Sequence, residues 1–98
     1  MGVDQEAQSV RDAFSRNLRR IRTQRGLSQE DLAHLTEMHR TEISVLERGR
    51  REPRLRTLVK LSAALETPLA ELSAGIEWQP LAPPPKGEVG RFRIDPPR

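Results

Sequence analysis

The sequence contains no cysteine, and only 3% of its residues are aromatic. The absence of cysteine excludes disulfide bonds, thiolate catalysis and cysteine-based metal sites. Strands need more aromatic and β-branched residues than this chain has, so its composition favours helices packed through leucine, isoleucine, valine and alanine. A chain of 98 residues has room for one domain with a modest core. We therefore predict a single all-α domain.

Long apolar runs are absent as well. No stretch approaches the roughly 18 apolar residues that a membrane span requires, and the polar, acidic start of the chain lacks the apolar core of an export signal. We therefore expect a cytoplasmic protein that makes no contact with a membrane. The chain is basic, with a formal charge of +3 and an isoelectric point near 10.5, so the distribution of its arginines matters more than the total.

The first predicted helix begins near Ser9 and follows a flexible arm of residues 1–8. Ser9 and Asp12 have the spacing of a capping box, in which a hydroxyl and a carboxylate bind the first backbone amides of a helix. Gly26 is placed to end this helix. The face that packs inward is marked by apolar residues at intervals of three and four, namely Val10, Ala13, Phe14, Leu18 and Ile21.

Two short helices follow with only three or four residues between them. Ser28 and Asp31 form a second capping box, the apolar pattern slips over residues 36–39, and helical spacing then resumes until Gly49. A connection this short forces the two helices to cross steeply, which is the geometry of a helix-turn-helix. We place this motif at about residues 29–48, within a domain of residues 9–76.

Two further helices complete the predicted domain. The apolar residues of 55–65 indicate a fourth helix, and Pro68 favours the start of a fifth. In the fifth helix we expect Leu69 and Leu72 to complete the core. Ile76 and Trp78 lie beyond this compact unit and are therefore candidates for a subunit interface.

Residues 77–98 form a proline-rich tail that we expect to be extended, because consecutive prolines forbid regular helix. Within it, residues 89–94 have the composition of one short strand. Two interpretations remain open. The tail is either disordered, or its Phe92 and Ile94 segment pairs with the same segment of a second subunit or contacts another protein.

Residues 26–72 resemble the XRE family of helix-turn-helix proteins, which includes the phage repressors and Cro. Three runs carry the resemblance: Gly26–Ala33, His39–Pro53 and Leu58–Leu65. The second run also resembles the branch that contains restriction-modification controller proteins, which are small dimeric regulators. The resemblance implies a five-helix repressor-like domain that binds double-stranded DNA sequence-specifically, as a homodimer on a pseudo-palindromic operator.

The resemblance also implies a set of DNA contacts, most of which lie on the second helix of the motif and the loop after it. Arg40 would donate two hydrogen bonds to guanine, while Thr41 and Val45 would offer methyl groups to thymine. Gln29 would meet a phosphate at a helix N-terminus. Glu42 would either accept from cytosine or pair with a nearby arginine. The full set comprises Gln29, His39, Arg40, Thr41, Glu42, Ser44, Val45, Arg48, Arg50 and Arg51.

Three positions have a structural meaning by the same resemblance. Glu47 would pair with Arg22 and tie the recognition helix to the first helix. Glu37 stands in the turn where the family usually has glycine, and a left-handed conformation there would cost about 1 kcal/mol. His39 stands where the family often has a serine or threonine cap.

Other functions receive less support from the sequence. His34 and His39 have no third ligand nearby, so no metal site is expected. Glu30, Asp31 and Glu37 could suggest acid–base chemistry, but no nucleophile accompanies them and the sequence has no glycine-rich phosphate loop, so we expect neither an enzyme nor a bound cofactor. The alternative function is a protein-interaction module on the same scaffold, such as an antitoxin, and the tail offers a place for a protein partner.

Overall fold

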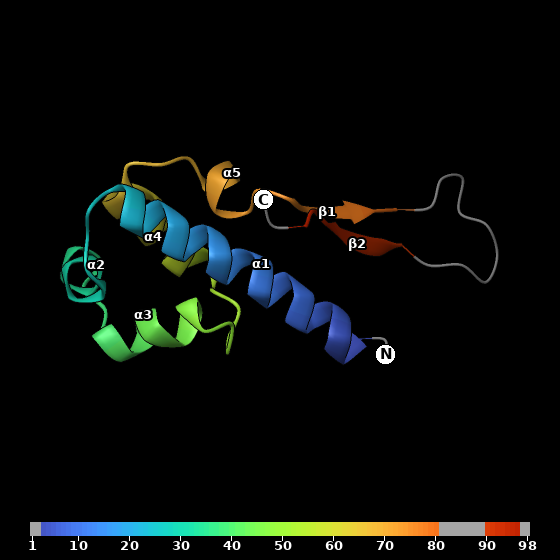
Figure 1. The fold of residues 1–98 in the computed structure, drawn as a ribbon, viewed down its shortest axis with the longest axis horizontal. Coiled ribbons are helices and arrows are strands. Elements are labelled where there is room, and N and C mark those ends of the chain that lie inside the picture. The colour runs from blue at the N-terminus through green and yellow to red at the C-terminus, as the bar shows by residue number, and fades with distance from the viewer. Residues whose placement is uncertain (1–2, 81–89, 97–98) are drawn as a thin grey trace.

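The structure is a computed structural model that describes residues 3–80 and 90–96. In this part of the chain, helices occupy the first three quarters and a small antiparallel sheet follows them (Figure 1). The elements are α1 (Val3–Gln24), α2 (Gln29–Thr36), α3 (Arg40–Glu47), α4 (Leu55–Leu65), α5 (Leu69–Leu72), β1 (Ile76–Gln79) and β2 (Arg91–Ile94). None of the helices in these ranges is long and apolar enough to cross a bilayer.

Helix α1 begins at Val3, so the predicted flexible arm is wrong for residues 3–8, while residues 1 and 2 lie outside the described part. Ser9 does not cap the helix. Its hydroxyl donates to the carbonyl of Gln5, 3.1 Å away, within the preceding turn. The predicted end is correct, because Gly26 follows α1 at a φ of +71°.

The predicted helix-turn-helix is confirmed by α2 and α3. Both halves of the second capping box form: Ser28 Oγ accepts from the amide of Asp31, and Asp31 Oδ2 accepts from the amide of Ser28, each at 2.9 Å. Glu37 adopts a left-handed conformation, with φ 56° and ψ 40°, directly after α2. The turn therefore has the shape that glycine usually adopts, with a glutamate in its place.

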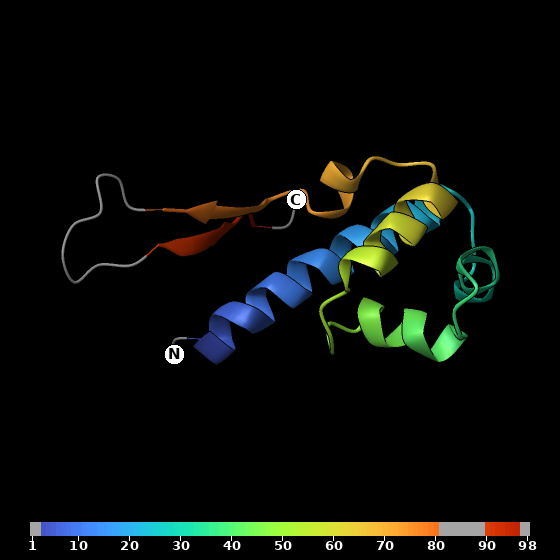
Figure 2. The same cartoon turned by 180° about the vertical axis from the view of Figure 1, so that it is seen from behind.

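A single core joins all five helices. α3 contributes Ile43 and Leu46, so the opposite side of this helix faces outward. Leu72 is fully buried, as expected, whereas Leu69 is 41% exposed. The core residues are Phe14, Leu18, Ile21, Leu32, Ala33, Ile43, Leu46, Leu61, Leu65 and Leu72. In Figure 2, which is seen from behind, α4 (yellow-green) lies in front of α1 (blue).

The small sheet corrects the all-α prediction. Helix α5 ends at Leu72, and Gly75, at a φ of +82°, turns the chain into β1, so that Ile76 is extended rather than helical. Ile76 faces Ile94, and Trp78 faces Phe92 across the sheet. Because alternate residues share a face, these four side chains lie on one side.

The sheet also changes the interpretation of the tail. Ile76 packs against the core, so it is not available as the interface residue that we expected. The short strand predicted near the end of the chain is present at Arg91–Ile94, but its partner is β1 of the same chain. The intervening residues 81–89 and the last two residues lie outside the described part.

Candidate nucleic-acid interface

The outward side of α3 carries the residues that the sequence assigned to DNA. Arg40, Thr41 and Glu42 are exposed in its first turn, and Ser44 and Val45 are partly exposed one turn later. This arrangement follows from the two residues that anchor α3 in the core, since they face the opposite way. The polar face is therefore open along the whole length of the helix.

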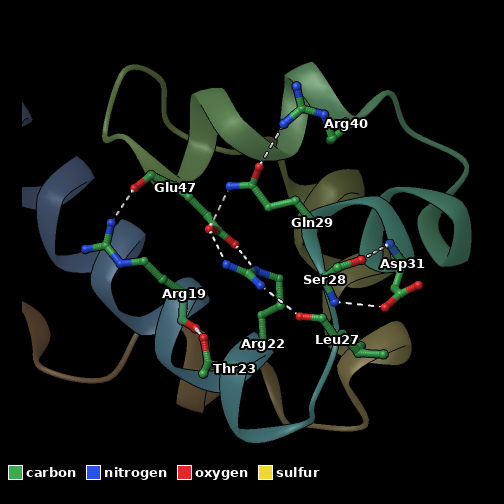
Figure 3. A network of polar contacts seen from close by, with 9 residues as sticks. All are labelled: Arg19, Arg22, Thr23, Leu27, Ser28, Gln29, Asp31, Arg40 and Glu47. Atoms are coloured by element: carbon green, nitrogen blue, oxygen red, sulfur yellow. Dashed lines mark hydrogen bonds and ion pairs between the residues drawn. The ribbon is translucent and has the colours of Figure 1, made fainter.

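An ion pair below this face holds α3 to α1, as predicted. The carboxylate of Glu47 is almost completely buried, with 3% of its side chain exposed. Arg22 donates to it twice, from Nε at 2.5 Å and from Nη2 at 2.9 Å (Figure 3). The hydrogen bond to Glu47 raises the pKa of Arg22, so this guanidinium stays charged. Arg22 Nη1 also donates to the carbonyl of Leu27 at 2.8 Å.

Gln29 continues this network to the surface. Its Nε2 donates to Glu47 at 3.1 Å, and its Oε1 accepts from Nη1 of Arg40 at 3.2 Å (Figure 3). Both ends of the amide are thus engaged, and Arg40 is held at the junction of α2 and α3. Holding a long side chain in place before binding lowers the entropy that binding must remove.

Glu42 caps the first turn of α3, the helix to which it belongs. Oε1 of Glu42 accepts a hydrogen bond from the backbone amide of His39 at 3.3 Å. A carboxylate here also faces the positive end of the helix dipole. From the sequence we expected Glu42 either to accept from cytosine or to pair with an arginine, and neither role includes this contact. In a capping box, the side chain of the third helical residue binds the cap residue's amide in the same way.

Arginines follow α3 directly. Arg48, Arg50 and Arg51 are exposed, and no carboxylate lies within ion-pair distance of them in the described residues. Arg48 donates from Nε to the carbonyl of Ser44 at 3.3 Å. These guanidinium groups are available to an anion beside the outward face of α3.

Comparison with known proteins gives the family. Residues 18–72 match the helix-turn-helix family HTH_3. The chain belongs to this family. The XRE-type resemblance stated from the sequence is therefore confirmed, and the matched region of this HTH_3 protein contains α2, α3 and the loop after them.

Relatives of this HTH_3 chain include a control protein and two structures of regulators. Control protein C.SmaI of Serratia marcescens is 38% identical over 63 residues, which are 64% of this chain and 75% of that protein. The restriction-modification controller protein C.AhdI of Aeromonas hydrophila is 40% identical, with a TM-score of 0.62 over 63% of this chain and 94% of that one. The clp gene regulator ClgR of C. glutamicum is 30% identical, with a TM-score of 0.62. The match covers 64% of this chain and 82% of that one. These relatives are regulators and controllers rather than enzymes, in agreement with our expectation.

One group of side chains was not assembled by the sequence analysis of this HTH_3 chain. Arg16 and Arg19 of α1 lie beside Arg48 and Arg50 and line one cleft with them. The sequence carries no local signal for this grouping, because only tertiary packing brings α1 beside the loop that contains Arg48 and Arg50.

Proposed function

We propose that this chain is a sequence-specific DNA-binding transcriptional regulator that places α3 in the major groove of double-stranded DNA. The observation that carries the proposal is the outward polar face of α3, with Arg40 held in place by Gln29 and arginines directly after the helix. Membership of the HTH_3 family and the likeness to controller and regulator proteins support it.

Within this proposal, the two turns of α3 read base edges. Arg40 has the bidentate donor geometry that suits guanine, and Thr41 and Val45 supply methyl groups for thymine. Ser44 is a hydroxyl contact on the same side. Glu42 acts first on its own helix, through the amide of His39.

The surrounding residues would fix the position of the helix on the DNA backbone. Phosphate contacts carry no sequence information directly but set the register of the protein. Gln29 lies at the N-terminus of α2, where a phosphate would also meet backbone amides and the helix dipole. The remaining phosphate contacts in this proposal are His39, Arg48, Arg50 and Arg51.

We also propose that the chain acts as a homodimer, because one recognition helix covers too few base pairs to select a site, and proteins of this type pair on two half-sites. The strongest candidate surface is on α4. Leu55 and Val59 lie one turn apart on the same face, 70% and 52% exposed. Leu69 of α5 is a further exposed apolar residue, and burying such side chains between two copies would favour association.

Selection of duplexes from a random-sequence pool tests the proposal. We expect enrichment of a pseudo-palindrome whose half-sites are one helical turn apart. Arg40→Ala should weaken binding to the enriched duplex by about 1–3 kcal/mol and relax the preference at one base pair. Arg20→Ala, which removes an exposed arginine of α1 outside these surfaces, should change neither. A wild-type chain without duplex affinity at low salt would contradict the proposal and leave the protein-binding alternative.

A further inference from the structure

We propose that α1 supplies a second contact to the DNA backbone, through Arg16 and Arg19, beside the contact made by the loop after α3. This inference rests on the proposed DNA binding and extends it beyond the helix-turn-helix. The family match begins at residue 18, so the turns of α1 that contain Arg16 lie outside it.

The proposed site is an open cleft between α1 and the end of α3. Its lining residues are Asp12, Ser15, Arg16, Arg19, Glu47, Arg48 and Arg50. Four of them are arginines and only two are acidic. The acidic pair is already engaged, because Glu47 binds Arg22 and Gln29, and Asp12 accepts from Gln8 at 2.7 Å. The cleft therefore carries excess positive charge.

The arginines of the cleft keep donors for a ligand. None of them lies within ion-pair distance of a carboxylate in residues 5–80 and 90–96. Arg19 uses Nη1 for a weak hydrogen bond to the backbone carbonyl of Glu47, at 3.3 Å, and keeps its other donors. Guanidinium groups match the geometry of phosphate oxygens, so a cleft lined by four of them suits a phosphate.

The cleft lies where a bound duplex would pass. In Figures 1 and 2, α1 runs diagonally past the end of α3, and its first turns reach the side of the molecule on which α3 lies. The cleft residues of α1 meet α3 at its C-terminal end, where Glu47 and Arg48 line the same cleft. A DNA backbone flanking the groove that α3 enters would meet α1 at this point.

The loop that completes the cleft is fixed to α1. Gln8 donates to the carbonyl of Gly49 at 3.0 Å and also to Asp12. Gly49 is buried at a φ of +67°, and a Cβ there would lie 2.6 Å from Oδ1 of Asp12. This close packing holds the backbone of Arg48 and Arg50 beside α1, so the loop that carries these two arginines is in place before any ligand arrives.

The test compares the salt dependence of binding in two charge-matched variants of the full chain. The probe is the duplex that the wild-type protein enriches from a random pool. Each lost phosphate contact reduces the log–log slope of affinity against salt by about 0.9. For Arg16→Gln/Arg19→Gln we expect the loss of affinity between 50 and 200 mM salt to be about tenfold smaller than for wild type. We expect Arg20→Gln/Arg25→Gln, which removes two arginines outside the cleft, to keep the wild-type slope.

Further measurements separate the outcomes. Arg16→Lys/Arg19→Lys should restore the slope, and unfolding temperatures within about 2 °C of wild type would show that the variants fold. Equal slopes for both glutamine variants overturn the inference and leave the proposed function intact. If Arg16→Gln/Arg19→Gln keeps the wild-type slope but loses affinity for poly-glutamate, the inference is overturned. The cleft would then bind an acidic peptide instead of the DNA backbone. A wild-type chain that enriches no duplex removes the proposed function itself.

Discussion

Glu47 of α3 is bound by Arg22 of α1 through two hydrogen bonds, and 3% of the glutamate side chain is exposed. Removing the carboxylate would leave the Arg22 charge partly buried and without its ion-pair partner. We therefore predict that Glu47→Ala lowers the free energy of unfolding by about 3–5 kcal/mol. Arg40→Ala, which removes one exposed hydrogen bond, should lower it by less than about 1 kcal/mol. Chemical denaturation measures both, and equal losses would contradict the assignment.

Gly49 is constrained both by its backbone and by its neighbour. Gly49→Ala would place a left-handed alanine against Asp12, whereas Gly26→Ala meets no atom within 4 Å. The left-handed conformation costs each variant about 1–2 kcal/mol. We predict that Gly49→Ala loses about 1 kcal/mol more, because Asp12 must move away from Gln8. In an Asp12→Ala background the two glycine substitutions should cost the same.

Glu37 offers an opportunity to stabilise the fold. It holds a φ of 56° between α2 and α3, a conformation that glycine adopts without steric cost. We predict that Glu37→Gly raises the free energy of unfolding by about 0.5–1 kcal/mol. Glu30→Gly, inside α2, should lower it by about 1 kcal/mol. If both variants were destabilised equally, the left-handed turn would not be a source of strain.

The cap of α2 should give stability a specific pH dependence. Hydrogen bonds from the backbone and side chain of Ser28 lower the pKa of Asp31 below its ordinary value of 3.8. A carboxyl whose pKa is lower in the folded state contributes stability that is present above the unfolded value and lost as pH falls through the folded value. The stability difference between wild type and Asp31→Asn should therefore be constant above about pH 5 and shrink below pH 4. A difference that grows toward acid would contradict this.

Local signals in the sequence predicted the centre of this fold well. The Ser28–Asp31 box, the turn at Glu37 and the pairing of Arg22 with Glu47 all form. These features depend on a short spacing or on a family pattern, and neither requires knowledge of distant contacts. The outward face of α3 could also be predicted, because the helical spacing of Ile43 and Leu46 requires both residues to face inward.

The two ends of the chain were predicted less well, for different reasons. Ser9 has the spacing of a cap, but its hydroxyl can also bind the preceding turn, and here it binds Gln5. Ile76 continues the spacing of Leu72 only by coincidence, since Gly75 redirects the chain and β1 pairs with a strand twelve or more residues further on. Pairing over that distance leaves no local pattern.

The sheet also provides an optical reporter. Trp78 is the chain's one tryptophan. The centroids of the Trp78 and Phe92 rings lie 5.3 Å apart in an edge-on arrangement. The Trp78 ring also packs against Gly90. Its fluorescence would follow β1 and β2, whereas far-ultraviolet circular dichroism follows chiefly the helices. Recording both signals during one melt would show whether the hairpin dissociates before the helical domain or unfolds together with it.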